Sequence, residues 1–172
     1  FILLFPTQSV GAEIEFCLYS QTSNLPIDDS VFANTTTLNE QEEFISELYD
    51  QLQQQDIEIE LLHAESAPGQ FELVLRYQHD AIQLADNVVL ARETISAVAR
   101  SHQMKALYLP KIHASKAGSG MHVHLSIRDT TENHGIDNAF PHPTCRGDIS
   151  VKGQHFMEGI LSHLPGLTAL TI

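Results

Sequence analysis

The chain has 172 residues, the length of a single domain, and 42% of them are hydrophobic, which is enough to build a core. Its formal net charge of −13 and its lack of a basic run exclude nucleic acid and anionic membrane surfaces as expected partners, because their phosphates need neutralising cations. No apolar run approaches the ~20 residues of a membrane-spanning helix. Two cysteines are too few for a disulfide framework, so we expect a cytoplasmic protein.

The first predicted strand covers residues 10–19, VGAEIEFCLY, where apolar residues alternate with others. Its period of two places Glu13 and Glu15 on the same face. Two carboxylates that close together repel each other unless a cation lies between or beside them. A solvated strand face with an ordinary Glu-x-Glu pair is the alternative.

Residues 20–37 are polar and predict a loop, and apolar spacing then predicts a packing helix over residues 38–54, with Asn39 as its cap. A strand follows over residues 57–62, and we expect its two glutamates to face water. Three of its apolar residues are expected to face the core: Ile57, Ile59 and Leu61.

A second chemical stretch covers residues 63–73, HAESAPGQFEL, in which Pro68 and Gly69 mark a turn before another strand. The turn can bring Glu65 and Glu72 to the same side of a sheet. Together with the first strand this makes four carboxylates, and carboxylates with an imidazole suit Mg²⁺ or Mn²⁺ better than zinc. A hairpin with two exposed glutamates is the alternative.

Residues 79–102 predict a long helix with Asp80 near its start, which we expect to cover one face of the sheet, and residues 105–110 predict a strand. The polar stretch 130–150 predicts a loop with exposed histidines, His134 and His142. A final amphipathic helix over residues 152–164 is expected to stop at the Pro165-Gly166 pair.

Residues 118–126, GSGMHVHLS, predict a strand behind a glycine loop that allows a ligand to approach the backbone closely. The strand period puts one set of polar residues on one face: His122, His124 and Ser126. The other face is apolar enough to bury: Met121, Val123, Leu125 and Ile127. Neutral imidazole is a common metal ligand, but a half-buried strand with two satisfied histidines is the alternative.

Four motifs, GAEIEF, HAESAPGQFEL, LYLPKI and GSGMHVHLSI, follow one another in this chain in an order and spacing that resemble the catalytic domain of glutamine synthetase. The end, HFMEGILSHLPGLTALT, is similar to the family helix that comes next, and details such as LARETISAVAR resemble the FluG or nodulin-type branch. The resemblance implies an α+β fold with a curved, antiparallel-rich sheet backed by helices, and makes residues 1–172 a partial catalytic domain.

The resemblance also implies a two-metal site for Mg²⁺ or Mn²⁺ beside bound ATP. By motif position, the first metal is expected to be held by Glu15, Glu65 and Glu72, and the second by Glu13 and His122. The nucleotide is expected to lie near His124, Ser126 and Tyr77. Gly118 is expected to approach the amino-acid substrate, and Glu65 is the candidate catalytic residue that holds ammonium.

The activity implied is the ATP-dependent joining of glutamate and ammonia through γ-glutamyl phosphate, in a homo-oligomeric ring. Two departures from the family pattern, Ala117 in place of Asn and Ile112 in place of Pro, leave the substrate open. The chain begins without Met and lacks the family's amino-terminal domain and later arginines, so we expect a piece of a longer protein. The alternatives are a ligase for another amine, a non-catalytic relative with a structural or assembly role, and an unrelated metal-binding domain.

Overall fold

The structure is a computed structural model that describes residues 8–29, 32–128, 138–142 and 144–171. The chain divides into two compact units: a larger one, Val10–His124, and a smaller one made of Leu125–Ile172 with Phe1–Ser9. Among the described residues, no helix is both long enough and apolar enough to cross a bilayer.

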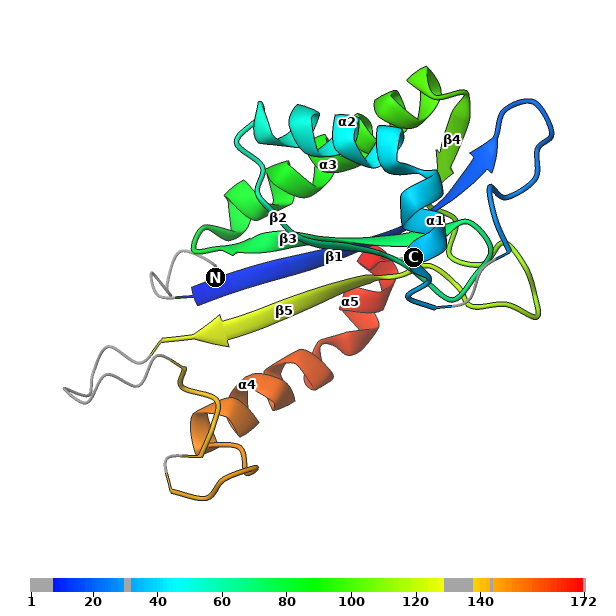
Figure 1. The fold of residues 1–172 in the computed structure, drawn as a ribbon. Helices are drawn as coiled ribbons and strands as arrows, with labels where there is room; N and C mark the ends of the chain where they lie inside the picture. Colours follow the sequence, from blue (N-terminus) through cyan, green and yellow to red (C-terminus); the bar gives the residue numbers. More distant parts are fainter. Residues whose placement is uncertain (1–7, 30–31, 129–137, 143, 172) are drawn as a thin grey trace. The chain divides into compact units, whose positions relative to one another are not determined.

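An antiparallel sheet with the strand order β2-β3-β1-β4 forms the centre of the larger unit, and β5 also pairs with β1. Its strands are β1 (Gln8–Ser20), β2 (Ile59–Ala64), β3 (Gln70–Gln78), β4 (Met104–Leu107) and β5 (Met121–Ile127). Helices α2 (Glu42–Gln53) and α3 (Ala81–Ser101) lie on one side of β1, β2 and β3 (Figure 1). This sheet backed by helices confirms the predicted α+β class.

Strand β1 has the predicted two faces because its apolar residues alternate with polar ones. Its core side chains are all 2% exposed or less: Ala12, Ile14, Phe16 and Leu18. Phe16 stacks on Phe71 of β3 with ring centroids 5.9 Å apart. The opposite face carries Glu13 and Glu15, and the register pairs Glu15 with Glu72. Burial of the apolar face therefore fixes the direction of the carboxylates.

Helix α3 confirms the predicted cover of the sheet. Asp80 caps it, since its side chain accepts hydrogen bonds from the backbone N–H groups of Ile82 and Gln83. Its buried residues recur at helical spacing: Leu84, Asn87, Ala91, Thr94, Ile95, Val98 and Ala99.

The helix predicted over residues 38–54 is wrong in its start and in its continuity. The structure has two helices, α1 (Thr35–Glu40) and α2, separated by Gln41, whose backbone is not helical. Asn39 lies inside α1, and the cap of α1 is Asn34, whose side chain accepts from the N–H of Thr36. The first backbone N–H groups of a helix have no partner within it, so the side chain of Asn34 can accept from one of them. Asn39 lies near the end of α1, where the backbone N–H groups are already bonded within the helix.

The inward face predicted for β2 is wrong at Leu61, which is 50% exposed, while Leu62 is buried. The register against β3 shifts between Ile59 and Leu61. A bulge at that point sends the following side chains to the opposite face. The same shift puts His63 opposite Glu72.

The turn between β2 and β3 depends on Gly69, as the Pro-Gly pair predicted. Its φ of +67° belongs to the left-handed region, and an added Cβ would lie 2.4 Å from the backbone oxygen of Leu18. We expect Gly69→Ala to lower the free energy of unfolding by about 2 kcal/mol, which urea denaturation would measure. Gly159→Ala, in a helix where an added Cβ meets nothing within 4 Å, is the control. Equal stability of the two variants would contradict this reading of the turn.

Two helices form most of the described smaller unit, α4 (Val151–Ser162) and α5 (Leu164–Thr171). The helix predicted over residues 152–164 does end just before the Pro165-Gly166 pair, at Ser162. The pair does not interrupt helical structure further, because Pro165 lies in the first turn of α5, where a missing N–H costs nothing. His142 is partly buried rather than exposed, and its Nδ1 accepts from the N–H groups of Thr144 and Cys145. His134 lies outside the described residues.

The apolar face predicted to be buried on β5 is mostly open. Met121 is 50% exposed, Val123 52% and Leu125 40%, whereas Ile127 is partly buried. The alternation of β5 is correct, but the described part of the larger unit places no element over these side chains. Burial on a strand requires a packing partner as well as an apolar face.

Candidate functional site

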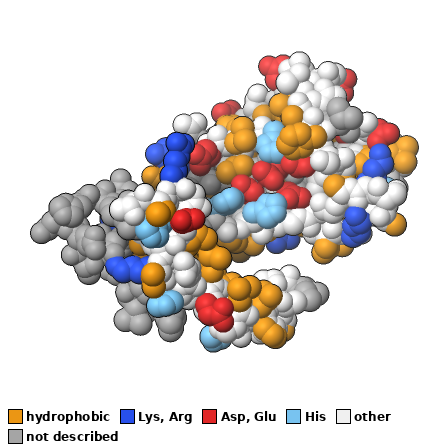
Figure 2. All heavy atoms as spheres, turned by 90° about the horizontal axis from the view of Figure 1, so that it is seen from below, with side chains coloured by type: hydrophobic (Ala, Val, Ile, Leu, Met, Phe, Trp, Pro, Cys, Tyr) orange, Lys and Arg blue, Asp and Glu red, His pale blue; other side chains and the backbone are white. Residues whose placement is uncertain are grey.

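The face of the sheet opposite α2 and α3 carries the chemical side chains. The β1–β3 register pairs Glu15 with Glu72 and Glu13 with Val74, so both strands contribute carboxylates to one face. Figure 2 shows acidic and histidine side chains gathered on this face, and two groups of potential metal ligands lie among them.

The first group joins β1, β3 and β5. One ligand atom from each of Glu13, Glu72 and His122 lies within 4.8 Å of the others. His122 donates from Nδ1 to Glu13 Oε2 over 2.9 Å, and His124 donates from Nε2 to Glu13 Oε1 over 2.7 Å. Both predicted histidines therefore point to the same carboxylate.

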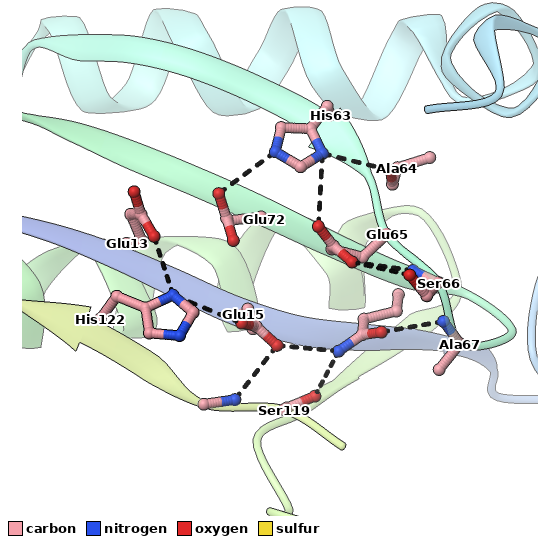
Figure 3. A network of polar contacts seen from close by, with 12 residues as sticks. Glu13, Glu15, His63, Ala64, Glu65, Ser66, Ala67, Glu72, Ser119 and His122 are labelled. Atoms are coloured by element: carbon pink, nitrogen blue, oxygen red, sulfur yellow. Dashed lines mark hydrogen bonds and ion pairs between the residues drawn. The ribbon is translucent and has the colours of Figure 1, made fainter. Parts of the chain in front are cut away.

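The second group surrounds the hairpin between β2 and β3 and consists of His63, Glu65 and Glu72 (Figure 3). The Nε2 atom of His63 lies 3.2 Å from Glu72 Oε1, and its Nδ1 lies 3.8 Å from Glu65 Oε1. Glu65 Oε2 accepts from the N–H and the hydroxyl of Ser66. Glu72 belongs to both groups, so it is the carboxylate on which they converge.

Glu15 is in neither three-residue group, although it lies on β1 directly opposite Glu72, which belongs to both. Its Oε2 accepts hydrogen bonds from Gln70 Nε2 over 3.0 Å and from the N–H of Gly120 over 3.1 Å. Its Oε1 lies 4.0 Å from His122 Nδ1. One oxygen is therefore held by the protein, and the other faces the first group.

The crowding of carboxylates shifts their protonation. Burial, followed by the charge of Glu13, raises the pKa of Glu72. Burial alone would also raise the pKa of Glu13, but hydrogen bonds from His124 and His122 outweigh it and lower the pKa. The hydrogen bond to Glu13 raises the pKa of His122. Burial thus disfavours the negative charge of Glu72, whereas the two histidines stabilise that of Glu13.

The structure supplies a donor set that fits a hard divalent cation. Ligand oxygens at about 2.1 Å from Mg²⁺ in octahedral geometry are about 3 to 4 Å from one another. In each of the two groups the distances between ligand atoms are at most 4.8 Å, so only small movements would bring these atoms into that range. Carboxylate oxygens with one imidazole per group match Mg²⁺ or Mn²⁺ rather than a thiolate-rich zinc site.

The residues predicted to bind the nucleotide, Tyr77, His124 and Ser126, belong to neither ligand group. An added Cβ on Gly11 would lie 3.7 Å from His124 Cβ and 3.8 Å from Tyr77 Cβ, so His124 and Tyr77 flank one point of β1. The Tyr77 ring is half exposed and packs edge-on against His79. Ser126 lies in the smaller unit and is partly buried.

Gly118 has a packing reason for being glycine. An added Cβ would lie 2.5 Å from the backbone oxygen of Pro110, so no other residue fits there without movement. Its own carbonyl accepts from Gln70 Nε2 over 2.9 Å. Its expected approach to an amino-acid substrate stays a prediction.

Two residues of the site were missed from the sequence, His63 and Gln70. Each stands two positions before an expected metal ligand, Glu65 and Glu72 respectively. The two-residue strand period was therefore the signal, since it places such pairs on the same face.

Comparison with known proteins agrees with these motifs. The family model described as "Glutamine synthetase, catalytic domain" matches residues 4–172. Glutamine synthetase of Thermus thermophilus is 33% identical over 172 residues, which cover 97% of this chain and 37% of that protein. Gamma-glutamylpolyamine synthetase of Streptomyces coelicolor is 36% identical over 118 residues, 68% of this chain and 24% of that protein.

Solved structures share the fold. A GmaS/ADP complex matches with a TM-score of 0.79 at 27% identity, over 95% of this chain and 38% of the other. A crystal structure of a novel glutamine synthase homolog also matches with a TM-score of 0.79, at 26% identity, over 95% of this chain and 36% of the other. The chain spans 37% of the length of the Thermus relative. It belongs to the glutamine synthetase family, whose catalytic-domain model matches nearly its whole length.

Proposed function

We propose that this chain is the metal-binding part of an ATP-dependent glutamate–ammonia ligase that forms glutamine through γ-glutamyl phosphate. The observation that carries the proposal is the convergence of Glu13, Glu72 and His122 from three strands, beside a second group that contains Glu65. The names of the relatives support this reaction, and the GmaS complex with ADP supports a nucleotide site.

We assign the carboxylates and His122 to two divalent cations, Mg²⁺ or Mn²⁺. Bound cations supply the neutralisation of phosphate charge that phosphoryl transfer requires. Glu13, Glu72 and His122 would hold one cation, with Glu15 Oε1 on the side of His122. Glu65 and Glu72 would hold the other, next to His63. Glu65 would also attract ammonium through its negative charge and hold it in place before ammonium loses its proton.

The substrates bind on the same face of the sheet. His124 and Tyr77, which flank Gly11, are proposed to contact the nucleotide. The assignment of Ser126 to the nucleotide rests on its motif position alone. Gly118 is proposed to bring its backbone close to the amino-acid substrate, as its position in the family motif implies. The complete protein is proposed to work in the cytoplasm as a homo-oligomeric ring.

A second candidate is a ligase that joins glutamate to another amine. The relative named gamma-glutamylpolyamine synthetase supports it, and so does Ala117, which cannot offer the amide that the family pattern has before the glycine loop. A non-catalytic relative that keeps the metal strands for structure is the third reading.

We expect the 172 residues alone to show no ligase activity, because the chain spans only 37% of the length of its Thermus relative. The test compares ATP-dependent γ-glutamyl amide formation by the chain and by the full-length protein, with ammonia and with polyamines as acceptors. Ammonia-dependent glutamine formation by the full-length protein supports the first reading, and polyamine dependence supports the second. Activity of the 172 residues alone would contradict the expectation.

A further inference from the structure

The side chain of Gln70, the first residue of β3, is buried and hydrogen-bonded at both ends. Its Oε1 accepts from the N–H of Ala67 over 2.9 Å. Its Nε2 lies 3.0 Å from Glu15 Oε2, 2.9 Å from the Gly118 oxygen and 3.1 Å from Ser119 Oγ. Because a backbone N–H only donates, and a carbonyl or ionised carboxylate only accepts, the amide can have one orientation.

These bonds decide which oxygen of Glu15 is available. Its Oε2 takes one donor from Gln70 and a second from the N–H of Gly120, so that oxygen is directed toward the glycine loop. Its Oε1 is left on the side of His122 Nδ1, at 4.0 Å. Figure 3 shows Glu15, Ser119 and Ala67 joined in one network of contacts.

We propose that Gln70 is a positioning residue of the cation site. It orients Glu15 so that Oε1 faces the group formed by Glu13, Glu72 and His122, and it links the glycine loop to the carboxylate of Glu15 by hydrogen bonds. The inference rests on the proposed cation site and adds a residue that binds no cation itself. The Gln side chain can make all these hydrogen bonds at once, because its amide oxygen accepts from Ala67 while its amide nitrogen donates to Glu15 and Gly118. Partners that orient metal ligands typically change metal affinity 10- to 100-fold when they are removed.

The test is calorimetric titration of Mn²⁺ into the unaltered chain, Gln70→Met and Asn87→Ala. Met fills a similar volume without hydrogen bonds. Asn87 is also a buried amide, 5% exposed, but it accepts from Gln83 on the helix α3, away from the carboxylates. We expect about 10- to 100-fold weaker binding in Gln70→Met and unchanged binding in Asn87→Ala, both compared at a temperature where circular dichroism shows each chain folded.

Equal Mn²⁺ affinity of Gln70→Met and the unaltered chain would overturn the role of Gln70 and leave the cation site standing. No Mn²⁺ binding by the unaltered, folded chain would overturn the cation site and this inference together, so the two failures can be told apart.

Nuclear magnetic resonance of the unaltered chain gives a second test should Gln70→Met fail to fold. We expect the side-chain amide protons of Gln70 to exchange much more slowly than those of the exposed Gln54, and to shift on addition of Mg²⁺. Exchange as fast as that of Gln54, or no shift at saturating Mg²⁺, would contradict the proposal.

Discussion

Replacing Glu72 by Gln is expected to weaken Mn²⁺ binding at both proposed sites by at least about 100-fold, since even indirect partners of a metal cost 10- to 100-fold. Glu72 is the only residue that the two ligand groups share. Gln keeps the oxygen that accepts from His63 and has nearly the same shape, so the effect isolates the lost charge.

The same substitution is not expected to destabilise the metal-free chain. The pKa of Glu72 is raised by burial and by the charge of Glu13, which means that its ionised form is unfavourable in the folded protein. A neutral Gln removes that cost, so the melting temperature should stay the same or rise. Loss of metal affinity together with equal or higher stability separates a ligand from a residue that merely supports the fold.

Glu60→Gln is the matched control for Glu72→Gln. Glu60 is an exposed glutamate on the neighbouring strand β2 and belongs to neither ligand group. Both variants lose one negative charge, so a general electrostatic effect would weaken binding in both. Equal Mn²⁺ affinity of the two variants would contradict the assignment of Glu72.

The second large effect is expected at His122, in contrast to its neighbour His124. The two side chains are each 65% exposed, and both donate to Glu13. Only His122 lies in a ligand group. His122→Ala should therefore weaken Mn²⁺ binding at one site by about 100-fold or more, whereas His124→Ala should change it less than about threefold.

Titration of ADP in the presence of Mg²⁺ completes the comparison of the two histidines. His124→Ala is expected to weaken ADP binding, since His124 and Tyr77 flank the proposed nucleotide position. Similar losses of Mn²⁺ affinity in the two variants would show that both histidines serve the cation, and would remove the reason for assigning His124 to the nucleotide.

The correct sequence predictions concern local patterns in which packing allows only one arrangement of the side chains. The alternation along β1 fixes Glu13 and Glu15 on one face because the other face packs under the helices. The Pro-Gly turn fixes the hairpin and so brings Glu65 and Glu72 to one histidine. The assignment of residues 1–172 to one partial domain stays a prediction.

The errors come from features that depend on neighbouring strands or helices. The bulge between Ile59 and Leu61 is a matter of register with β3 and leaves no mark in the alternation of β2 itself. The break at Gln41 ends α1 within a continuous apolar pattern. The strand period places His63 and Gln70 on the same side as Glu65 and Glu72. It does not show that His63 meets Glu72 or that Gln70 meets Glu15, because those partners come from neighbouring strands.

The most direct test of the account is calorimetric titration of Mn²⁺ into the unaltered 172-residue chain. We expect saturable binding that is lost in a Glu15→Ala, Glu65→Ala, His122→Ala triple variant, because the variant removes one member of each ligand group together with the carboxylate of Glu15. A folded chain that binds no Mn²⁺, or a triple variant that binds it as well as the unaltered chain, would contradict the assignment of this face as a cation site.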